Sequence, residues 1–430
     1  MKRSGLWAND DFLKLWIGET ISIFGSLIGR TALIFTAVLV LDASPLQVGL
    51  LAAADIVPGL AFGFLAGVWV DRVNRRPIMI AADVGRAALL GTVPLAYAFD
   101  SLTIEQLFAV AVGMGSLTIF ADVAYFAYVP SLLGKDELLE GNSKVAATNS
   151  VAEIGAFSAA GWLVQALTGP VAVAVDAVSF LVSSVFTLAI KKPETRDRGQ
   201  ETGDGEPGAL WREITEGVRT TVRHSVLRVL AASEVTAAFS FSVYGAVYLL
   251  FVTNELGFKP GVLGLFFAVG GVTSLVGSLY ATRAARTFGA GRTIALGRMT
   301  LGAFMLLVLG ANDASVYAAA LLIGQQLGDS AWTIADINDV TLRQAVTPEN
   351  VIGRVKASTR QATLGAMLLG SLAGGLIGEL AGLRTALVVG SGGTIAGGLI
   401  AMLPAVWNTR AIPIEARAPD PAAAPAPLEP

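Results

Sequence analysis

Residues 103–129 read TIEQLFAVAVGMGSLTIFADVAYFAYV, a stretch whose only charged residues are Glu105 and Asp122. A helix needs about 20 mainly apolar residues to cross the hydrocarbon core of a bilayer. The stretch is long enough, and it lacks the polar–apolar alternation over about 10 residues that marks a transmembrane β-strand. Because unpaired backbone groups are costly in lipid, so long an apolar run predicts a membrane-spanning helix.

The same pattern recurs along the whole chain of 430 residues, of which 54% are hydrophobic and only 15% are charged. A soluble protein of this size carries more charge on its surface, and a disordered chain has the opposite composition. The sequence therefore predicts an all-α polytopic membrane protein with about twelve spans. The expected spans are residues 12–41, 46–70, 78–98, 103–129, 145–167, 171–190, 226–253, 261–282, 293–312, 314–337, 357–380 and 383–407.

The basic residues orient these spans, because Lys and Arg concentrate on the cytoplasmic side of membrane proteins. With a cytoplasmic N-terminus, all but five of the 30 basic residues lie in the termini or the loops of that side. The exceptions are Lys259, Arg384, Arg30, Arg86 and Arg298. We therefore expect a monomeric multi-pass protein of the cell (plasma or inner) membrane, in contact with lipid and with both termini cytoplasmic.

The chain divides into two similar halves, residues 1–190 and residues 225–410, each with six expected spans. Halves with an even number of spans share one orientation, which predicts two pseudo-symmetric six-helix bundles with a cavity between them. A shift of 212 positions aligns charged residues of the halves in the pairs Arg86 with Arg298, Glu137 with Glu349, and Lys144 with Lys356.

Two segments lie outside the halves. Residues 191–224 are a polar linker that ends in an expected amphipathic helix on the membrane surface. Residues 411–430 are rich in Pro and Ala, and we expect them to form a disordered tail.

Residues 67–77, GVWVDRVNRRP, lie between the second and third expected spans. A Gly here permits close helix contact, and an Asp can interact with a neighbouring helix N-terminus while arginines bind it or lipid headgroups. The segment resembles the loop motif G-x-x-x-D-R-x-x-R-R of the major facilitator superfamily, with Asn74 where that family usually has Gly. The residues that match the motif are Gly67, Asp71, Arg72, Arg75 and Arg76.

Three further stretches resemble the drug- and siderophore-exporter branch of that superfamily: VPSLL at 129–133, DAVSF at 176–180 and LRQAVTPENVIGRV at 342–355. The resemblance extends from about residue 8 to residue 410, and it implies the superfamily's fold of 12 transmembrane helices. It also implies a conformational latch, in which Asp71 and its arginine neighbours hold the cytoplasmic ends of the second and eleventh spans together in the outward-open state.

Two motifs of proton-coupled exporters are altered in this chain. Residues 155–161 keep the glycines of the superfamily's antiporter motif without its Pro, and residues 109–115 lack the Arg that many such exporters carry in the fourth span. The resemblance therefore leaves open whether protons drive transport by the usual arrangement.

Ionisable residues inside the spans are the candidates for function, because a charge at the bilayer centre costs about 2.5–3.5 kcal/mol and needs a partner or a cavity. Glu19 and Arg30 share one face of the first span, but at about 16 Å apart they cannot pair with each other. Acids with aromatic neighbours suit an amphipathic organic substrate, including a cationic one. A structural ion pair or helix cap is the alternative for each acid. The candidates for binding substrate or protons are Glu19, Arg30, Asp55, Asp122, Tyr125, Glu153, Glu234, Tyr244, Tyr248, Gln325, Asp329, Trp332 and Asp336.

The composition also excludes several functions. The chain has no Cys and one His, which removes thiolate metal sites and histidine clusters, and its net charge of −3 argues against a nucleic-acid partner. We expect no metal, no cofactor and no enzymatic activity. Without a phosphate-binding loop, the energy must come from a gradient. The sequence predicts a secondary transporter, most simply a proton-coupled exporter of a small amphipathic drug or natural product. A siderophore or lysophospholipid carrier, and export without proton coupling, stay open.

Overall fold

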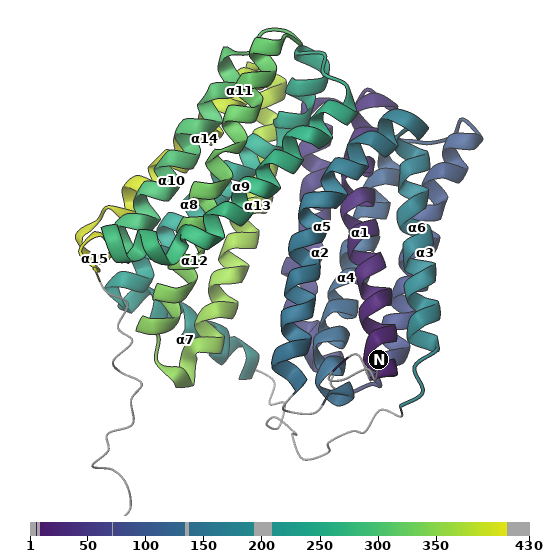
Figure 1. Cartoon of the computed structure of the whole chain (residues 1–430), viewed down its shortest axis with the longest axis horizontal. Coiled ribbons are helices and arrows are strands. Elements are labelled where there is room, and N and C mark those ends of the chain that lie inside the picture. Colours follow the sequence, from purple (N-terminus) through teal and green to yellow (C-terminus); the bar gives the residue numbers. More distant parts are fainter. Residues whose placement is uncertain (1–5, 7–8, 71, 134–136, 193–208, 411–430) are drawn as a thin grey trace, which may run out of the picture.

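The chain folds into two bundles of long helices that stand side by side in Figure 1. The structure, a computed structural model, describes residues 6, 9–70, 72–133, 137–192 and 209–410. Those residues contain no β-strand, as the continuous apolar runs predict. Asp71, residues 193–208 of the expected linker and the expected tail lie outside the described residues.

The first bundle consists of α1 (Asp10–Leu39), α2 (Pro45–Val70), α3 (Arg75–Ala98), α4 (Ile104–Leu132), α5 (Leu138–Leu167) and α6 (Gly169–Leu188). Side-chain oxygens satisfy backbone N–H groups where two of these helices begin. Asn9 Oδ1 accepts from Phe12 N at 3.1 Å before α1, and Thr103 Oγ1 accepts from Gln106 N at 3.3 Å before α4.

The second bundle consists of α8 (Ser225–Leu250), α9 (Pro260–Phe288), α10 (Ala290–Met305), α11 (Val316–Gln326), α12 (Gly328–Val346), α13 (Ile352–Ala381) and α14 (Leu383–Ala401). Short helical segments join or end them: η3 (Phe251–Glu255), η4 (Leu306–Gly310), η5 (Glu349–Val351) and α15 (Pro404–Trp407). The amphipathic segment forms α7 (Ala209–Arg223), which precedes α8 and packs on α13. There Arg354 of α13 donates to Glu216 of α7 at 2.7 Å.

Ten helices among the described residues are long and apolar enough to cross a membrane. The other two expected spans correspond to α5 and to the pair α11 and α12, so the count of twelve stays a prediction. The expected single span 314–337 is wrong in detail. It is broken at Leu327, between the flexible positions Gly324 and Gly328, and α12 continues to Val346. The candidate Gln325 therefore lies on α11, whereas Asp329, Trp332 and Asp336 lie on α12.

The two bundles meet through glycine backbones at the end of the molecule away from the N-terminus. A methyl group on Gly49 of α2 would lie 2.5 Å from Ser371 O of α13, and one on Gly161 of α5 would lie 2.3 Å from Pro260 O of α9. Gln165 Oε1 of α5 also accepts from Gly261 N of α9 at 3.0 Å. No side chain larger than hydrogen fits at these two glycines, so the helices touch backbone to backbone.

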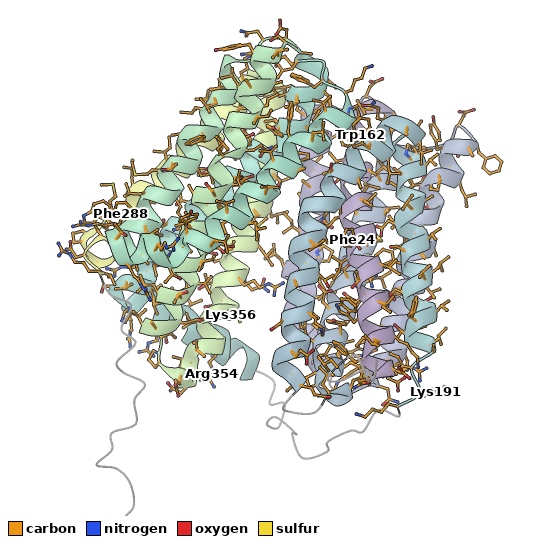
Figure 2. The ribbon with its side chains drawn as sticks, in the orientation of Figure 1. Phe24, Trp162, Lys191, Phe288, Arg354 and Lys356 are labelled. Carbon is orange, nitrogen blue, oxygen red and sulfur yellow. The ribbon has the colours of Figure 1, made fainter. Side chains whose placement is uncertain are left out.

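The bundles diverge at the other end, which we call the N-terminal face because α1 begins there and α7 lies there (Figure 1). Figure 2 shows Lys191, Arg354 and Lys356 toward this face and Trp162 toward the opposite face. On α2, contact with α13 reaches Gly63, whose Cβ position is 3.0 Å from Gln361 Nε2. One turn nearer the N-terminal face, the Cβ position of Gly67 meets no described atom within 4 Å.

Candidate functional site

A cavity of about 270 Å³ lies in the first bundle, where α1, α3, α4 and α5 meet. Its charged lining consists of the carboxyl groups of Glu19 and Asp122 and the guanidinium group of Arg86. The rest of the lining is Ser22, Ile23, Ser26, Leu27, Thr118 and Asn149. Figure 2 labels Phe24, which follows the lining residue Ile23 on α1. A few polar groups on a concave wall are typical of a site for a small molecule.

Arg86 is fixed in the first bundle by three helices. It forms an ion pair with Asp83 of its own helix and donates to Thr118 Oγ1 of α4 at 3.5 Å. Its guanidinium carbon lies 4.1 Å from the ring centroid of Phe180 on α6. A buried cation is stable only when an anion and hydrogen-bond acceptors surround it. Arg86 and Asp83 thus neutralise each other as a structural pair.

Glu19 and Asp122 lack such partners. Neither side chain forms a hydrogen bond or ion pair within the part of the chain that the structure describes. Arg86 acts electrostatically on both, and Asp122 and Asp83 both act on Glu19. Within the first bundle, one arginine therefore faces three carboxyl groups, and one of them already binds it. A carboxylate left without a partner at membrane depth is suited to bind a proton or a cationic group.

Two other predicted residues of the first bundle neutralise each other. Arg30 of α1 forms an ion pair with Asp55 of α2, and its Nε donates to Asp55 Oδ2 at 3.1 Å. Tyr125 lies one turn from Asp122 and is buried in the apolar cluster around Phe12 and Tyr128. Glu19 acts electrostatically on it, although Tyr125 is not among the residues that line the cavity. Tyr125 stays a candidate, packed in the bundle core beside the cavity acids and not on the cavity wall.

Glu234 belongs to an ion network of the second bundle. Arg298 of α10 forms an ion pair with Asp339 of α12, and Asp339 also accepts from Arg343 at 2.8 Å. Arg343 continues to Glu234 of α8 at 2.5 Å, and Thr363 of α13 donates to the same carboxylate at 3.0 Å. The network joins four helices. Asp339 and Arg343 escaped the sequence prediction because the expected span ended at residue 337, although their spacing of four on one helix was visible.

Most of the remaining aromatic candidates surround the break between α11 and α12. Tyr244 and Tyr248 of α8 stack with ring centroids 5.3 Å apart, and Tyr248 OH donates to Gln325 Oε1 at 3.2 Å. Trp332 of α12 stacks on Phe241 of α8 at 6.1 Å.

The acidic candidates near this break differ in their surroundings. Asp329 lies against Gly270 of α9 and forms no ion pair with a described residue. Asp336 is exposed. The side chain of Glu153 on α5 lies outside the described part.

Four residues of the loop motif, Gly67, Arg72, Arg75 and Arg76, lie in the described part of the chain. The Cβ position of Gly67 meets no described atom within 4 Å, and Arg72 is exposed. Arg76 Nε donates to Thr187 O at 3.1 Å, and its Nη2 donates to Leu188 O at 2.6 Å. Arg76 therefore binds the last carbonyl groups of α6, a favourable place for a cation. Arg75 lies beside it in the first turn of α3.

Comparison with known families identifies the chain. The family model described as transmembrane secretion effector matches residues 6–427. The chain belongs to this family of major facilitator superfamily transporters. An uncharacterised MFS-type transporter of Bacillus subtilis (strain 168) is 24% identical to it, over 88% of this chain and 89% of that protein. Macrolide efflux protein A of Streptococcus pyogenes is 23% identical, over 58% of this chain and 60% of that protein.

The fold of this secretion-effector family member is also that of solved transporters. The crystal structure of a point variant of the nucleoside transporter NupG superimposes with a TM-score of 0.73 at 11% identity, over 91% of this chain and 99% of that one. The resemblance read from the loop motif is thus confirmed for the superfamily, for the all-helical MFS fold and for a multi-pass membrane protein.

Proposed function

We propose that this transporter exports a small amphipathic organic compound by alternating access and that protons drive it. The observation that carries the proposal is the first-bundle cavity, with Glu19 and Asp122 on its wall and no ion-pair partner for either within the described residues. Macrolide efflux protein A, with which the chain shares 23% identity, supports the outward direction.

The arrangement of the bundles supports alternating access. They touch at the face opposite the N-terminus and diverge at the N-terminal face. By the distribution of basic residues, the N-terminal face is the cytoplasmic one. In this state a substrate enters from the cytoplasm, and tilting one bundle against the other opens the site to the outside. The cell membrane potential of about 100 mV adds about 2.3 kcal/mol for each charge moved.

Carboxyl groups are the proton carriers in this mechanism. The single histidine, His224, lies before α8 at the N-terminal face, where its Nδ1 accepts from Leu227 N at 3.4 Å. Glu19 and Asp122 line the cavity at membrane depth. A proton on either group removes an unpaired charge, so a carboxyl group can take up a proton on one side of the membrane and release it on the other.

Substitution of the two acids tests the proposal. In an efflux-deficient bacterium, Glu19→Gln and Asp122→Asn should each reduce export of the transported compound by about 100-fold or more, since a proton-transfer group usually contributes a factor of about 10²–10⁴. Accumulation of ethidium, a macrolide, a siderophore and a lysophospholipid is measured, with membrane insertion checked for every variant. Glu105→Gln is the matched control, because Glu105 is an exposed acid at the far end of α4.

Three outcomes contradict the proposal. Full export by both cavity variants would show that the cavity acids are not needed. A transport rate in proteoliposomes that ignores an imposed pH gradient would remove proton coupling. Transport of only the siderophore or the lysophospholipid would replace the drug-like substrate class.

A further inference from the structure

Arg360 of α13 is a charged side chain of the second bundle that the ion network there does not use. It is exposed, and it forms no hydrogen bond or ion pair with a described residue. It lies 8 residues after the start of α13 at Ile352, about 12 Å from the N-terminal end of that helix. The neighbouring basic residue Arg354, in contrast, is bound to Glu216 of α7.

The contacts of its neighbours show where Arg360 points. Successive residues of a helix are about 100° apart around its axis. On one side, Gln361 Nε2 donates to Gly59 O of α2 at 3.5 Å, and Leu364 lies 3.4 Å from the Cβ position of Gly59. On the other side, Thr363 donates to Glu234 of α8. Arg360 lies between these directions, so it projects from α13 toward the space between the two bundles.

The acids of the first-bundle cavity lie at the same level. The part of α2 that contacts Gln361 also packs on α4, where the rings of Phe62 and Phe120 have centroids 6.3 Å apart. Asp122 follows two residues later on α4 and is exposed. Its charged neighbours are Glu19 of α1, Arg86 of α3 and Arg360, which acts electrostatically on it across the boundary between the bundles.

We propose that Arg360 is a specificity residue of the first-bundle cavity, where it acts as a built-in counter-cation for Asp122 that a positively charged substrate replaces. The inference rests on the proposed function and adds the substrate class, an amphipathic organic cation. A protonated amine or onium group of the substrate would bind the Asp122 carboxylate in place of Arg360. After the substrate is released, Arg360 would move back to this carboxylate. A neutral compound gains nothing from this exchange.

Cross-linking tests the placement of Arg360. The chain contains no cysteine, so a pair introduced at Asp122→Cys and Arg360→Cys is the only pair of thiols. A short bifunctional thiol reagent should link it in membranes. Asp122→Cys with Arg354→Cys is the matched control, since Arg354 lies about 120° around α13 and faces α7. Absence of the first cross-link, or equal linking of both pairs, overturns the inference.

Binding tests the charge competition. Purified Arg360→Gln protein in lipid nanodiscs should bind tetraphenylphosphonium about three- to tenfold more tightly than the wild type, because one repelling charge is removed at partly screened range. Lys356→Gln removes the same charge one turn away and should change binding less than about twofold. In the Asp122→Asn background the Arg360→Gln gain should vanish.

An unchanged affinity of Arg360→Gln, or an equal gain with Lys356→Gln, overturns the inference. The inference is also overturned if the protein exports neutral compounds while neither the wild type nor any variant binds tetraphenylphosphonium. The proposed function is judged separately by the accumulation assay with Glu19→Gln and Asp122→Asn. The proposed function is retained if Glu19→Gln and Asp122→Asn lose export while the binding tests contradict the cationic substrate class.

Discussion

Each bundle contains a buried arginine at the equivalent position of the repeat, and the two arginines are paired differently. Arg86 and Arg298 occupy positions related by the 212-residue repeat, and both side chains are almost fully buried. Arg86 pairs with an acid three residues away on its own helix. Arg298 pairs with Asp339 of another helix, which also binds Arg343.

The two bundles differ in which carboxyl groups are held in ion pairs. In the second bundle the charges connect α8, α10, α12 and α13, and the paired carboxylates are fully engaged. In the first bundle Arg86 is paired with Asp83, and Glu19 and Asp122 on the cavity wall form no ion pair with a described residue. The buried arginine of the second bundle thus connects several helices through ion pairs, whereas the buried arginine of the first bundle is paired within its own helix.

The largest expected effect is that of Asp339→Asn. Both Arg298 and Arg343 lose their shared anion, and breaking a buried ion pair on one side costs about 3–5 kcal/mol. Thermal unfolding in detergent, followed by size-exclusion fluorescence, should show a large loss of stability. Asp336→Asn is the matched control, because Asp336 is exposed on the same helix. Similar unfolding temperatures for the two variants would show that the ion network does not stabilise the second bundle.

Ser233→Ala should have a smaller effect on the same network. The Ser233 hydroxyl accepts from Arg298 and donates to Gly397 O of α14, so its removal takes one hydrogen bond from each of these groups. We expect a loss of about 1–3 kcal/mol in unfolding free energy. Ser278→Ala, an exposed serine of α9 bonded only to its own helix, provides the reference. A neutral Ser233→Ala would show that Arg298 needs no acceptor besides Asp339.

Thr118→Val tests the corresponding contact in the first bundle. Arg86 reaches Thr118 Oγ1 at 3.5 Å, the long end of hydrogen-bond range. The expected loss is about 0.5–1 kcal/mol, measured by the same unfolding assay. A loss as large as that of Ser233→Ala would remove the contrast between the two arginines.

The combined variant Glu19→Gln/Asp122→Asn should change stability least. Neither acid has a hydrogen-bond or ion-pair partner to lose among the described residues, so unfolding free energy should stay within about 0.5 kcal/mol of wild type. Export should fall all the same. A strongly destabilised double variant would mean that these acids hold the bundle together.

The sequence predicted the helices well because long apolar runs have few alternative structures in a membrane. It also selected Glu19 and Asp122, since an acid inside such a run stands out. It failed where side-chain direction or helix ends mattered. Tyr125 was a candidate for binding, yet its ring packs in the apolar cluster around Phe12 and Tyr128 and does not line the cavity. Asp339 lay beyond the expected end of a span that the structure extends to Val346. Partners on other helices, such as Asp339 for Arg298, depend on tertiary packing and have no local signal.

The glycine contacts between the bundles affect how fast one bundle can move relative to the other. At Gly49 and Gly161 the two bundles touch through backbone atoms, and no side chain of either glycine reaches across. Interlocked side chains would have to change rotamer before one bundle could turn on the other. Backbone surfaces in contact can shift with fewer rotamer changes than interlocked side chains. In the proposed alternating-access cycle, these two contacts would therefore add little to the activation energy of bundle movement.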